Sequence, residues 1–159
     1  MNAMVLAAGR GTRLEALGLV SFCKTTGGKG LHVVTPLKRA RLEWPDAKAF
    51  ARDLCTQMAA DSGDRYLVNM AKAKRGGHIF LDYLRNDRMA TAVAPLSLRG
   101  RPGAPVSMPL AWSQVKKGLD PAKYTVHTVP ALVARLTAWE DYCDGERPLA
   151  PAIKRLGKV

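Results

Sequence analysis

The chain has 159 residues, which is enough for one compact domain over residues 1–159 but too short for two comfortable ones. Its 47% hydrophobic and 24% charged residues are ordinary for a globular protein and exclude an intrinsically disordered chain. The 25 Lys and Arg residues against 13 Asp and Glu residues leave a net charge of +12. This excess favours a polyanionic partner, with nucleic acid as the leading candidate, although a basic but otherwise inert surface would give the same charge.

Cysteine usage and the amino-terminal residues bear on location. Cys23, Cys55 and Cys143 show no C-x-x-C spacing, so neither a disulfide framework nor a thiolate metal site is indicated, and a cytoplasmic location is expected. The chain begins with an apolar stretch, MNAMVLAAG, that is too short to span a membrane and lacks the features of a signal peptide. No membrane partner is therefore expected.

The first glycine motif lies at residues 6–14, LAAGRGTRL, and resembles the nucleotide-binding signature of sugar-phosphate nucleotidyltransferases. In that family a Pro-Lys pair on a second loop follows the motif, whereas residues 15–21 of this chain continue differently. Because short glycine motifs recur by chance, a working site at these residues is the less favoured interpretation.

A second glycine-rich loop, KTTGGKGLH, begins at Lys24. Its small residues, Thr26 and Gly28 among them, allow backbone N–H groups to approach a ligand. Lys29 and His32 offer positive charge to phosphate oxygens. The loop is not a P-loop, because glycine stands where that motif has Ser or Thr. A phosphate cradle and a tight turn that needs glycine for positive φ are both consistent with this sequence.

Two elements are predicted after this loop. Residues 31–35 form a β-branched run that Pro36 ends, which predicts a strand. Pro45 and Asp46 then introduce apolar residues at helical spacing, which predict an amphipathic helix near residues 46–60 with Asp46 capping its first turn. The apolar positions of this helix are Ala47, Phe50, Ala51, Leu54, Cys55 and Met58.

Another strand is predicted at residues 78–83, after a Gly-Gly pair. Alternation places Asp82 on the strand face that carries Phe80. A carboxylate that is half-buried among apolar neighbours needs a cation nearby. That cation is either a metal ion or a basic side chain, Arg85 or Lys74.

The remaining elements are short or extended. Residues 90–94 are predicted to form a strand, and the prolines over residues 95–109 predict an extended, stiff connection. In an extended segment Arg99 and Arg101 point the same way, so they either fork onto phosphates or lie in solvent at the surface. A proline-led apolar stripe predicts a helix near residues 130–142. This stripe comprises Leu132, Val133, Leu136 and Trp139.

Several of these segments together resemble one known family. They are LGLVSFCKTTGGKGLHVV from Leu17, AKAKR from Ala71, IFLDYLRN from Ile79, ATAVAP from Ala90 and RGRPGAPV from Arg99. In this order and spacing they are similar to the C-terminal half of the polymerase/primase domain of bacterial DNA ligase D, in the archaeo-eukaryotic primase superfamily. The resemblance covers residues 13–148 and leaves an atypical start at residues 1–12 and a basic tail at residues 149–159.

The resemblance implies an α+β fold, a partial primase-like domain whose mostly antiparallel sheet packs against the helices near residues 46–60 and 130–142. It implies a nucleotidyltransferase of the polymerase/primase type that acts in DNA repair by non-homologous end joining. The substrates would be nucleoside triphosphates and DNA ends, and the cofactor would be Mg²⁺ or Mn²⁺. The ligase and Ku components of end joining would be its partners.

The resemblance also implies residue roles. Asp82 would be the catalytic carboxylate and the metal ligand. The residues that would bind the nucleotide and its phosphates are Thr26, Gly28, Lys29, His32, Arg99 and Arg101. Five of them are expected to converge on one rim of the sheet, with His32 and Asp82 on the same face of two neighbouring strands. These five are Thr26, His32, Asp82, Arg99 and Arg101.

One part of the family pattern is missing. The family's first motif is an Asp-x-Asp pair upstream of the glycine loop, and no Asp-x-Asp occurs in this chain. Two-metal phosphoryl transfer needs carboxylates that bridge both ions, and Asp82 alone cannot hold that pair. The isolated chain is therefore expected to be inactive, with Asp82 beside a basic side chain. The alternative functions are a non-catalytic nucleotide-binding or DNA-binding remnant and a fragment of a sugar-phosphate nucleotidyltransferase.

Overall fold

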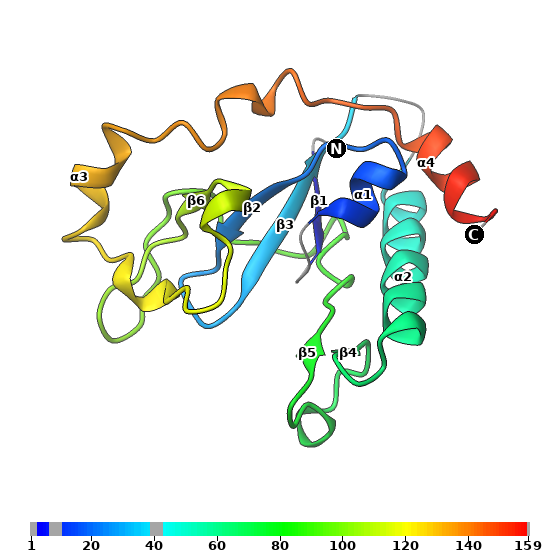
Figure 1. The fold of residues 1–159 in the computed structure, drawn as a ribbon, viewed down its shortest axis with the longest axis horizontal. Coiled ribbons are helices and arrows are strands. Elements are labelled where there is room, and N and C mark those ends of the chain that lie inside the picture. The colour runs from blue at the N-terminus through cyan, green and yellow to red at the C-terminus, as the bar shows by residue number, and fades with distance from the viewer. Residues whose placement is uncertain (1–2, 7–10, 39–42, 159) are drawn as a thin grey trace.

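The computed structural model describes residues 3–6, 11–38 and 43–158 (Figure 1). The strands are β1 (Ala3–Leu6), β2 (Phe22–Thr25), β3 (Leu31–Pro36), β4 (Tyr66–Leu67), β5 (Ile79–Phe80) and β6 (Pro109–Leu110). The α-helices are α1 (Thr12–Ala16), α2 (Trp44–Asp61), α3 (Val129–Val133) and α4 (Leu149–Leu156). Short 3-10 turns occur at Lys72–Lys74, Trp112–Gln114, Pro121–Lys123 and Glu140–Tyr142. Among the described residues, no helix combines the length and the apolar character needed to cross a membrane.

The central sheet has four antiparallel strands in the order β1-β3-β2-β6. A separate pair, β4 and β5, is parallel. Helices α1, α2 and α4 lie together at one end of the molecule, and α3 lies at the other end (Figure 1). This arrangement confirms the predicted α+β fold with a mostly antiparallel sheet.

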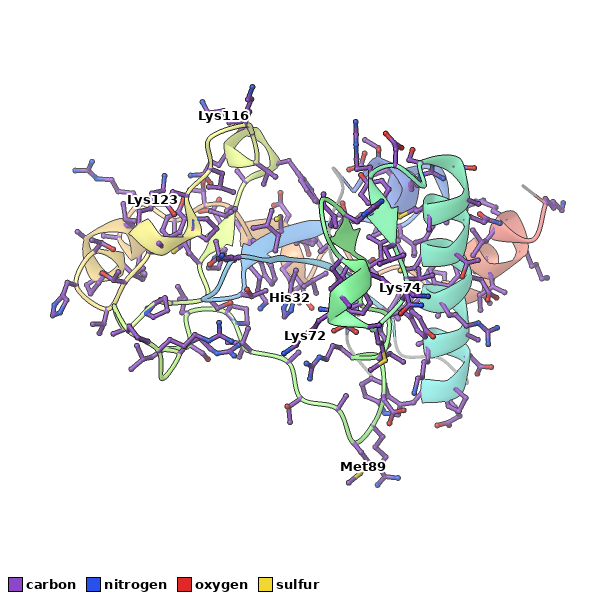
Figure 2. All side chains as sticks on the ribbon, turned by 90° about the horizontal axis from the view of Figure 1, so that it is seen from below. His32, Lys72, Lys74, Met89, Lys116 and Lys123 are labelled. Carbon is purple, nitrogen blue, oxygen red and sulfur yellow. The ribbon has the colours of Figure 1, made fainter. Side chains whose placement is uncertain are left out.

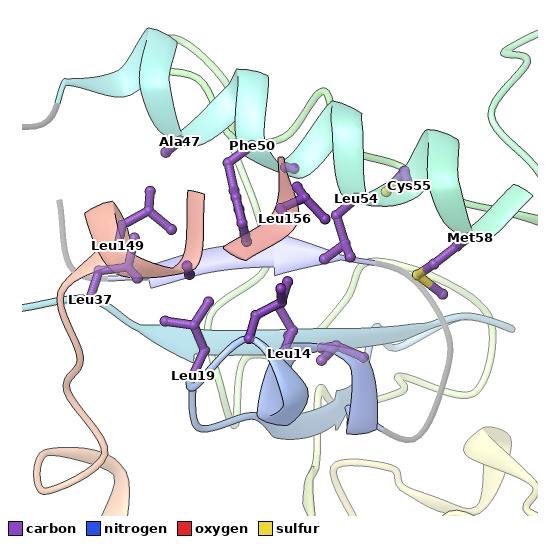
Figure 3. Packing of buried hydrophobic residues seen from close by; sticks show 14 of the residues in the cluster. Leu14, Leu19, Leu37, Ala47, Phe50, Leu54, Cys55, Met58, Leu149 and Leu156 are labelled. Carbon is purple, nitrogen blue, oxygen red and sulfur yellow. The ribbon is translucent and has the colours of Figure 1, made fainter. Parts of the chain in front are cut away.

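The main core forms between the sheet and α2, as the helical spacing of apolar residues predicted. Phe50, Leu54 and Met58 of α2 point toward the sheet and toward α1 (Figure 3). Glu43 precedes the helix, and its backbone N–H donates to the carboxylate of Asp46 at 2.9 Å. Asp46, in the first turn of α2, therefore satisfies the backbone N–H of the residue that precedes the helix.

The basic tail predicted at residues 149–159 contains the helix α4. Leu149, Ala152 and Leu156 of α4 are buried in the main core, where they join the residues of α2 (Figure 3). Between α3 and α4 the chain runs along one margin of the molecule (Figure 1). A second, smaller cluster of buried residues comprises Val106, Met108, Leu110, Tyr124 and Val129.

The prediction of a helix near residues 130–142 is wrong, because the helix in the structure is much shorter. Helix α3 has only 5 residues, Val129–Val133, and Leu132 and Val133 are 42% and 40% exposed. Further along, Trp139 stacks on Tyr142 with ring centroids 5.1 Å apart, and its Nε1 donates to the backbone oxygen of Cys23 at 2.9 Å. A continuous helix would have kept Trp139 on one stripe with Leu132, so this tertiary contact overrides the local pattern.

The predictions for the middle of the chain also need correction. The strand predicted at residues 78–83 is limited to Ile79–Phe80. Residues 90–94 do not form a strand, and residues 95–109 are not a stiff extended connection. Instead the chain folds back on itself, since the backbone N–H of Arg99 donates to Pro105 at 2.8 Å. The proline pattern did not reveal this turn, because two non-glycine residues adopt positive φ within it, Leu96 at 61° and Ala104 at 46°.

Candidate functional site

A cavity of about 450 Å³ lies where the glycine-rich loop, the start of β3 and the turn at residues 95–109 meet. Its lining residues are Thr26, Gly28, His32, Asp82, Arg85, Thr91, Ala92, Val93, Arg99 and Arg101. Five of the residues expected to converge, Thr26, His32, Asp82, Arg99 and Arg101, are therefore brought to one cavity from distant parts of the sequence, and Gly28 joins them.

The glycine-rich loop is both a tight turn and a wall of this cavity. Thr26 closes the turn, because its backbone N–H and its hydroxyl both donate to the carbonyl of Gly30, at 3.1 and 3.0 Å. Gly27 has φ of +65°, and a Cβ there would meet the side chain of Arg99. A Cβ at Gly28 would lie 3.1 Å from Nη1 of Arg101. The glycines thus let the two arginines approach the loop backbone closely.

Arg99 and Arg101 reach the cavity from a tight turn. The backbone N–H of Arg101 donates to the carbonyl of Arg99, and that of Ala104 donates to the carbonyl of Arg101. The guanidinium of Arg99 donates through Nη1 to the backbone oxygen of Thr26 at 3.2 Å. The two guanidinium groups therefore face one cavity, as the sequence predicted, although the segment that carries them is folded back rather than extended.

Asp82 lies in the cavity beside a basic side chain, as expected. Its Oδ2 is 3.3 Å from Nε of Arg85, and its Oδ1 accepts the backbone N–H of Leu84 at 3.1 Å. The expected strand geometry is wrong, because Asp82 lies beyond the end of β5, and β5 pairs with β4 rather than with β3. Asp82 and His32 line the same cavity, but they do not face each other across a pair of neighbouring strands.

Lys24, to which no sequence motif assigned a role of its own, is 3% exposed and lies at the base of this site. Lys24 is the cross-strand partner of His32 in the β2–β3 pair. Its Nζ donates to the backbone oxygen of Val93 at 2.6 Å and to the hydroxyl of Ser107 at 3.0 Å, and it lies 3.2 Å from Nδ1 of His32. A signal was present in the sequence, since Lys24 is the one charged residue within the strand Phe22–Thr25.

Burial and the neighbouring Lys24 together keep His32 neutral. Burial, followed by the charge of Arg99, lowers the pKa of Lys24 to about 8, so this amine still carries its proton at neutral pH. Burial, followed by the charge of Lys24, lowers the pKa of His32 to about 4, so the imidazole is neutral. An ammonium group has donors and no acceptor, so Nδ1 of His32 must accept and Nε2 must carry the ring proton. His32 is thereby prepared to donate one hydrogen bond from Nε2.

The charged groups of the site are mostly basic. Arg85, Arg99 and Arg101 line the cavity with Lys24 at its base, and the single acidic lining residue, Asp82, is already paired with Arg85. In the part of the chain that the structure describes, no group of three His, Cys, Asp or Glu residues could hold a metal ion. These donors suit an anion with several phosphate groups and do not fit a divalent metal ion.

Two sequence candidates lie away from the cavity. Lys29, predicted to bind phosphate, does not line it and instead lines a separate groove on the other side of the loop. Lys29 belongs to the same loop in sequence, but it does not line the cavity that holds Arg99 and Arg101. Of the motif at residues 6–14, residues 7–10 lie outside the described residues. Gly11 lies against Ser21 and Trp112 at the start of α1.

Comparisons with known proteins agree with this geometry. Residues 2–140 match the family described as LigD, primase-polymerase domain. The multifunctional non-homologous end joining protein LigD of Pseudomonas aeruginosa is 35% identical over 147 residues, which are 91% of this chain and 17% of that protein. The bifunctional LigD of Bacillus subtilis is 27% identical over 116 residues, which are 73% of this chain and 19% of that protein.

A solved structure shares the fold. The polymerase domain from Mycobacterium tuberculosis ligase D, in complex with DNA, superposes with a TM-score of 0.72 at 28% sequence identity. The match covers 92% of this chain and 55% of that one. Sequence and fold agree over most of the described residues, so the chain belongs to the LigD primase-polymerase domain family.

Proposed function

We propose that this chain carries the nucleotide-binding part of a DNA-repair nucleotidyltransferase that acts in non-homologous end joining. The proposal rests on one observation: the cavity is lined by Thr26, His32, Arg99 and Arg101. Relatives that are named as end joining proteins, and a related polymerase domain in complex with DNA, support DNA ends as the partner. The ligase and Ku components of end joining and a cytoplasmic location belong to the same proposal.

Each residue has a defined task in this proposal. The guanidinium groups of Arg99 and Arg101 bind the phosphates of a nucleoside triphosphate through charge-assisted hydrogen bonds. The neutral His32 donates from Nε2 to a phosphate oxygen, because Lys24 occupies Nδ1. Thr26 and Gly28 form the part of the cavity wall against which the triphosphate would pack.

The metal requirement of the reaction is not met by the described residues. The family resemblance assigns Asp82 to Mg²⁺ or Mn²⁺, a role that stays a prediction because the carboxylate is paired with Arg85. The sequence contains no Asp-x-Asp pair that would add the missing carboxylates. We therefore propose that the isolated chain binds nucleotide but does not extend a primer. This is also the behaviour expected of a non-catalytic binding remnant.

Nucleotide binding is tested by titrating the chain with a fluorescent ATP analogue. Arg101→Ala removes a charge from the cavity, and about tenfold weaker binding is expected, because a hydrogen bond to a charged group contributes about 1.5–3 kcal/mol. Arg88→Ala is the matched control, since Arg88 is exposed and does not line the cavity. Equal affinities of the two variants would contradict the assignment. In the same preparation, primer extension with Mg²⁺ or Mn²⁺ that Asp82→Ala abolishes would contradict the predicted inactivity.

A further inference from the structure

Lys24 bonds to three segments around the cavity assigned above to the nucleotide, but it does not line that cavity. Its Nζ lies 3.2 Å from Nδ1 of His32, 2.6 Å from the carbonyl oxygen of Val93 and 3.0 Å from the hydroxyl of Ser107. His32 and Val93 line the cavity. The backbone N–H of Ser107 donates to Ser97, in the turn that carries the two arginines of the cavity. A change at this one buried side chain therefore affects all three segments.

The neighbours of Lys24 fix the direction of each hydrogen bond. The carbonyl oxygen of Val93 can only accept, and the hydroxyl of Ser107 uses its hydrogen to donate to the backbone oxygen of Thr25 at 2.6 Å. Both atoms therefore take a hydrogen from Nζ, whatever the charge of the lysine. An ammonium group has one further hydrogen, which is left for Nδ1 of His32, so the proton of the neutral ring lies on Nε2.

A neutral Lys24 reverses the bond to His32. A neutral amine has one hydrogen fewer and gains a lone pair, and Val93 and Ser107 already take the hydrogens that remain. The lone pair then faces Nδ1 of His32, which must carry the ring proton and donate it. Loss of one proton from Lys24 thus changes Nε2 of His32 from a hydrogen-bond donor to an acceptor.

This change occurs on the wall of the cavity, because His32 lines it whereas Lys24 is buried behind it. His32 lies near the middle of the molecule, while Met89 lies at its margin (Figure 2). The phosphate oxygens of a nucleotide accept hydrogen bonds. They are therefore bound by an Nε2 that donates and repelled by an Nε2 that presents a lone pair.

We infer that Lys24 is a positioning residue that switches the nucleotide site through His32, which donates to a phosphate while Lys24 is protonated and loses that donor when Lys24 is neutral. The inference rests on the proposed function, because it describes the regulation of the same site. The switch needs no contact between Lys24 and the nucleotide.

The switch operates at mildly alkaline pH. Burial, followed by the charge of Arg99, lowers the pKa of Lys24 to about 8, and Cys23 opposes this shift. Bound phosphates are negative and favour the protonated lysine, so binding takes up a proton above this pH and the affinity falls as the pH rises. The titratable and charged groups around Lys24 and His32 are Cys23, Asp82, Arg85 and Arg99.

The first test is titration of the wild-type chain with the fluorescent ATP analogue at several pH values. The affinity is expected to weaken about tenfold between about pH 7 and about pH 9.5, because one proton is linked to binding. Lys24→Met removes the switch, so its affinity is expected to change less than about twofold over this range. Lys154→Met makes the same chemical change at an exposed lysine of α4 and is expected to keep the wild-type profile. A wild-type affinity that does not fall, or an equal fall in Lys24→Met, would overturn the inference.

His32→Gln separates this path from the plain charge of Lys24. Glutamine has no tautomers, so the fall in affinity over the same pH range is expected to shrink to about threefold or less. The full fall in this variant would overturn the role of His32, because Lys24 would then act on the phosphates by charge alone.

The tautomer itself is followed by NMR of the free wild-type chain with isotope-labelled histidine. The chemical shifts of the ring nitrogens distinguish a nitrogen that carries a hydrogen from one with a lone pair, and the signals of His32 are those missing from His32→Gln. Nε2 is expected to carry the hydrogen at about pH 7 and Nδ1 at about pH 9.5, and Lys24→Met is expected to show no change with pH. A merely structural Lys24 would leave the tautomer of the wild-type chain unchanged, and that result would overturn the inference.

Failure of the switch and failure of the proposed function are distinguishable. If the chain binds the ATP analogue equally well at both pH values, the proposed function stands and the switch fails. If the chain binds no nucleotide at any pH, the proposed function fails and the switch fails with it, whether or not the tautomer of His32 changes.

Discussion

At the scale of single residues, a buried lysine and a buried histidine determine the state of the site. Nζ of Lys24 lies within hydrogen-bond distance of Val93, Ser107 and His32, and among the described residues no ion pair joins it to a carboxylate. Removing a charge from water is costly unless hydrogen bonds compensate it. The hydrogen bonds of Lys24 offset part of this cost, while burial and the charge of Lys24 lower the pKa of His32 and leave it a neutral donor.

His32 makes stability depend on pH. Its pKa is about 4 in the folded chain, lowered from 6.5 mainly by burial and the charge of Lys24, with Arg85 and Arg99 adding to the shift and Asp82 opposing it. The unfolded chain therefore binds a proton more readily. The stability that depends on neutral His32 is fully present above pH 6.5 and is lost as the pH falls toward 4.

The expected loss from this one group between pH 7 and pH 5 is about 2 kcal/mol in the free energy of unfolding. Urea denaturation at the two pH values measures it. His32→Gln keeps a polar side chain but has no proton to gain in this range, so its stability is expected to change less between the same two values. A variant with the same pH dependence as the wild-type chain would show that His32 is not the group responsible.

At the scale of elements, the turn at residues 95–109 places both arginines, and its backbone is strained. Leu96 has φ of 61° and is 42% exposed, so its side chain gains little from burial. A branched residue with positive φ costs roughly 1 kcal/mol, because Cβ crowds the backbone. The backbone hydrogen bond from Leu96 to Ser107, at 2.7 Å, holds this conformation.

Replacing Leu96 by glycine is expected to leave stability within about 0.5 kcal/mol of the wild-type value or to raise it, because relief of strain offsets the extra freedom of glycine in the unfolded chain. Ser97→Gly is the matched control, since Ser97 is not among the described residues with positive φ. It is expected to lower stability by about 0.5–1 kcal/mol. Thermal unfolding of both variants makes the comparison, and equal destabilisation would show that Leu96 is not strained.

At the scale of the whole molecule, the core is completed by residues from opposite ends of the described chain. Leu14 of α1 and Leu149 and Leu156 of α4 belong to the same buried cluster as α2 (Figure 3). Gln57 of α2 also donates through Nε2 to the backbone oxygen of Leu156, at 3.3 Å. The carboxyl-terminal helix is therefore part of the domain core, although its sequence is rich in basic residues.

Leu156→Ala is expected to destabilise the chain by about 2–4 kcal/mol, because it removes a side chain that is 6% exposed and leaves a cavity against α2. Ile153→Ala, on the same helix, changes a side chain that is 36% exposed and is expected to cost less than about 1 kcal/mol. Urea denaturation of both variants measures the difference. Equal effects would indicate that α4 is not packed as described.

Features that depend on local chemistry could be predicted from the order of the residues alone. The β-branched run at residues 31–35, ended by Pro36, predicted β3, and the spacing of apolar residues predicted α2. The motifs around Thr26, His32, Asp82 and Arg99 identified residues that the structure brings to one cavity, together with the family that the comparisons confirm. These signals are local because backbone propensity and residue type act over a few positions.

The way in which these elements pack together depends on contacts between residues that are far apart in the sequence. Trp139 ends the predicted helix through its contacts with β2 and Tyr142, and the turn at residues 95–109 folds back through backbone hydrogen bonds that the proline spacing does not reveal. Asp82 and His32 line the same cavity, whereas Lys29 lines a different groove. The role of Lys24 depends on oxygen atoms at Val93 and Ser107, far away in sequence, so only burial and long-range contacts could show it.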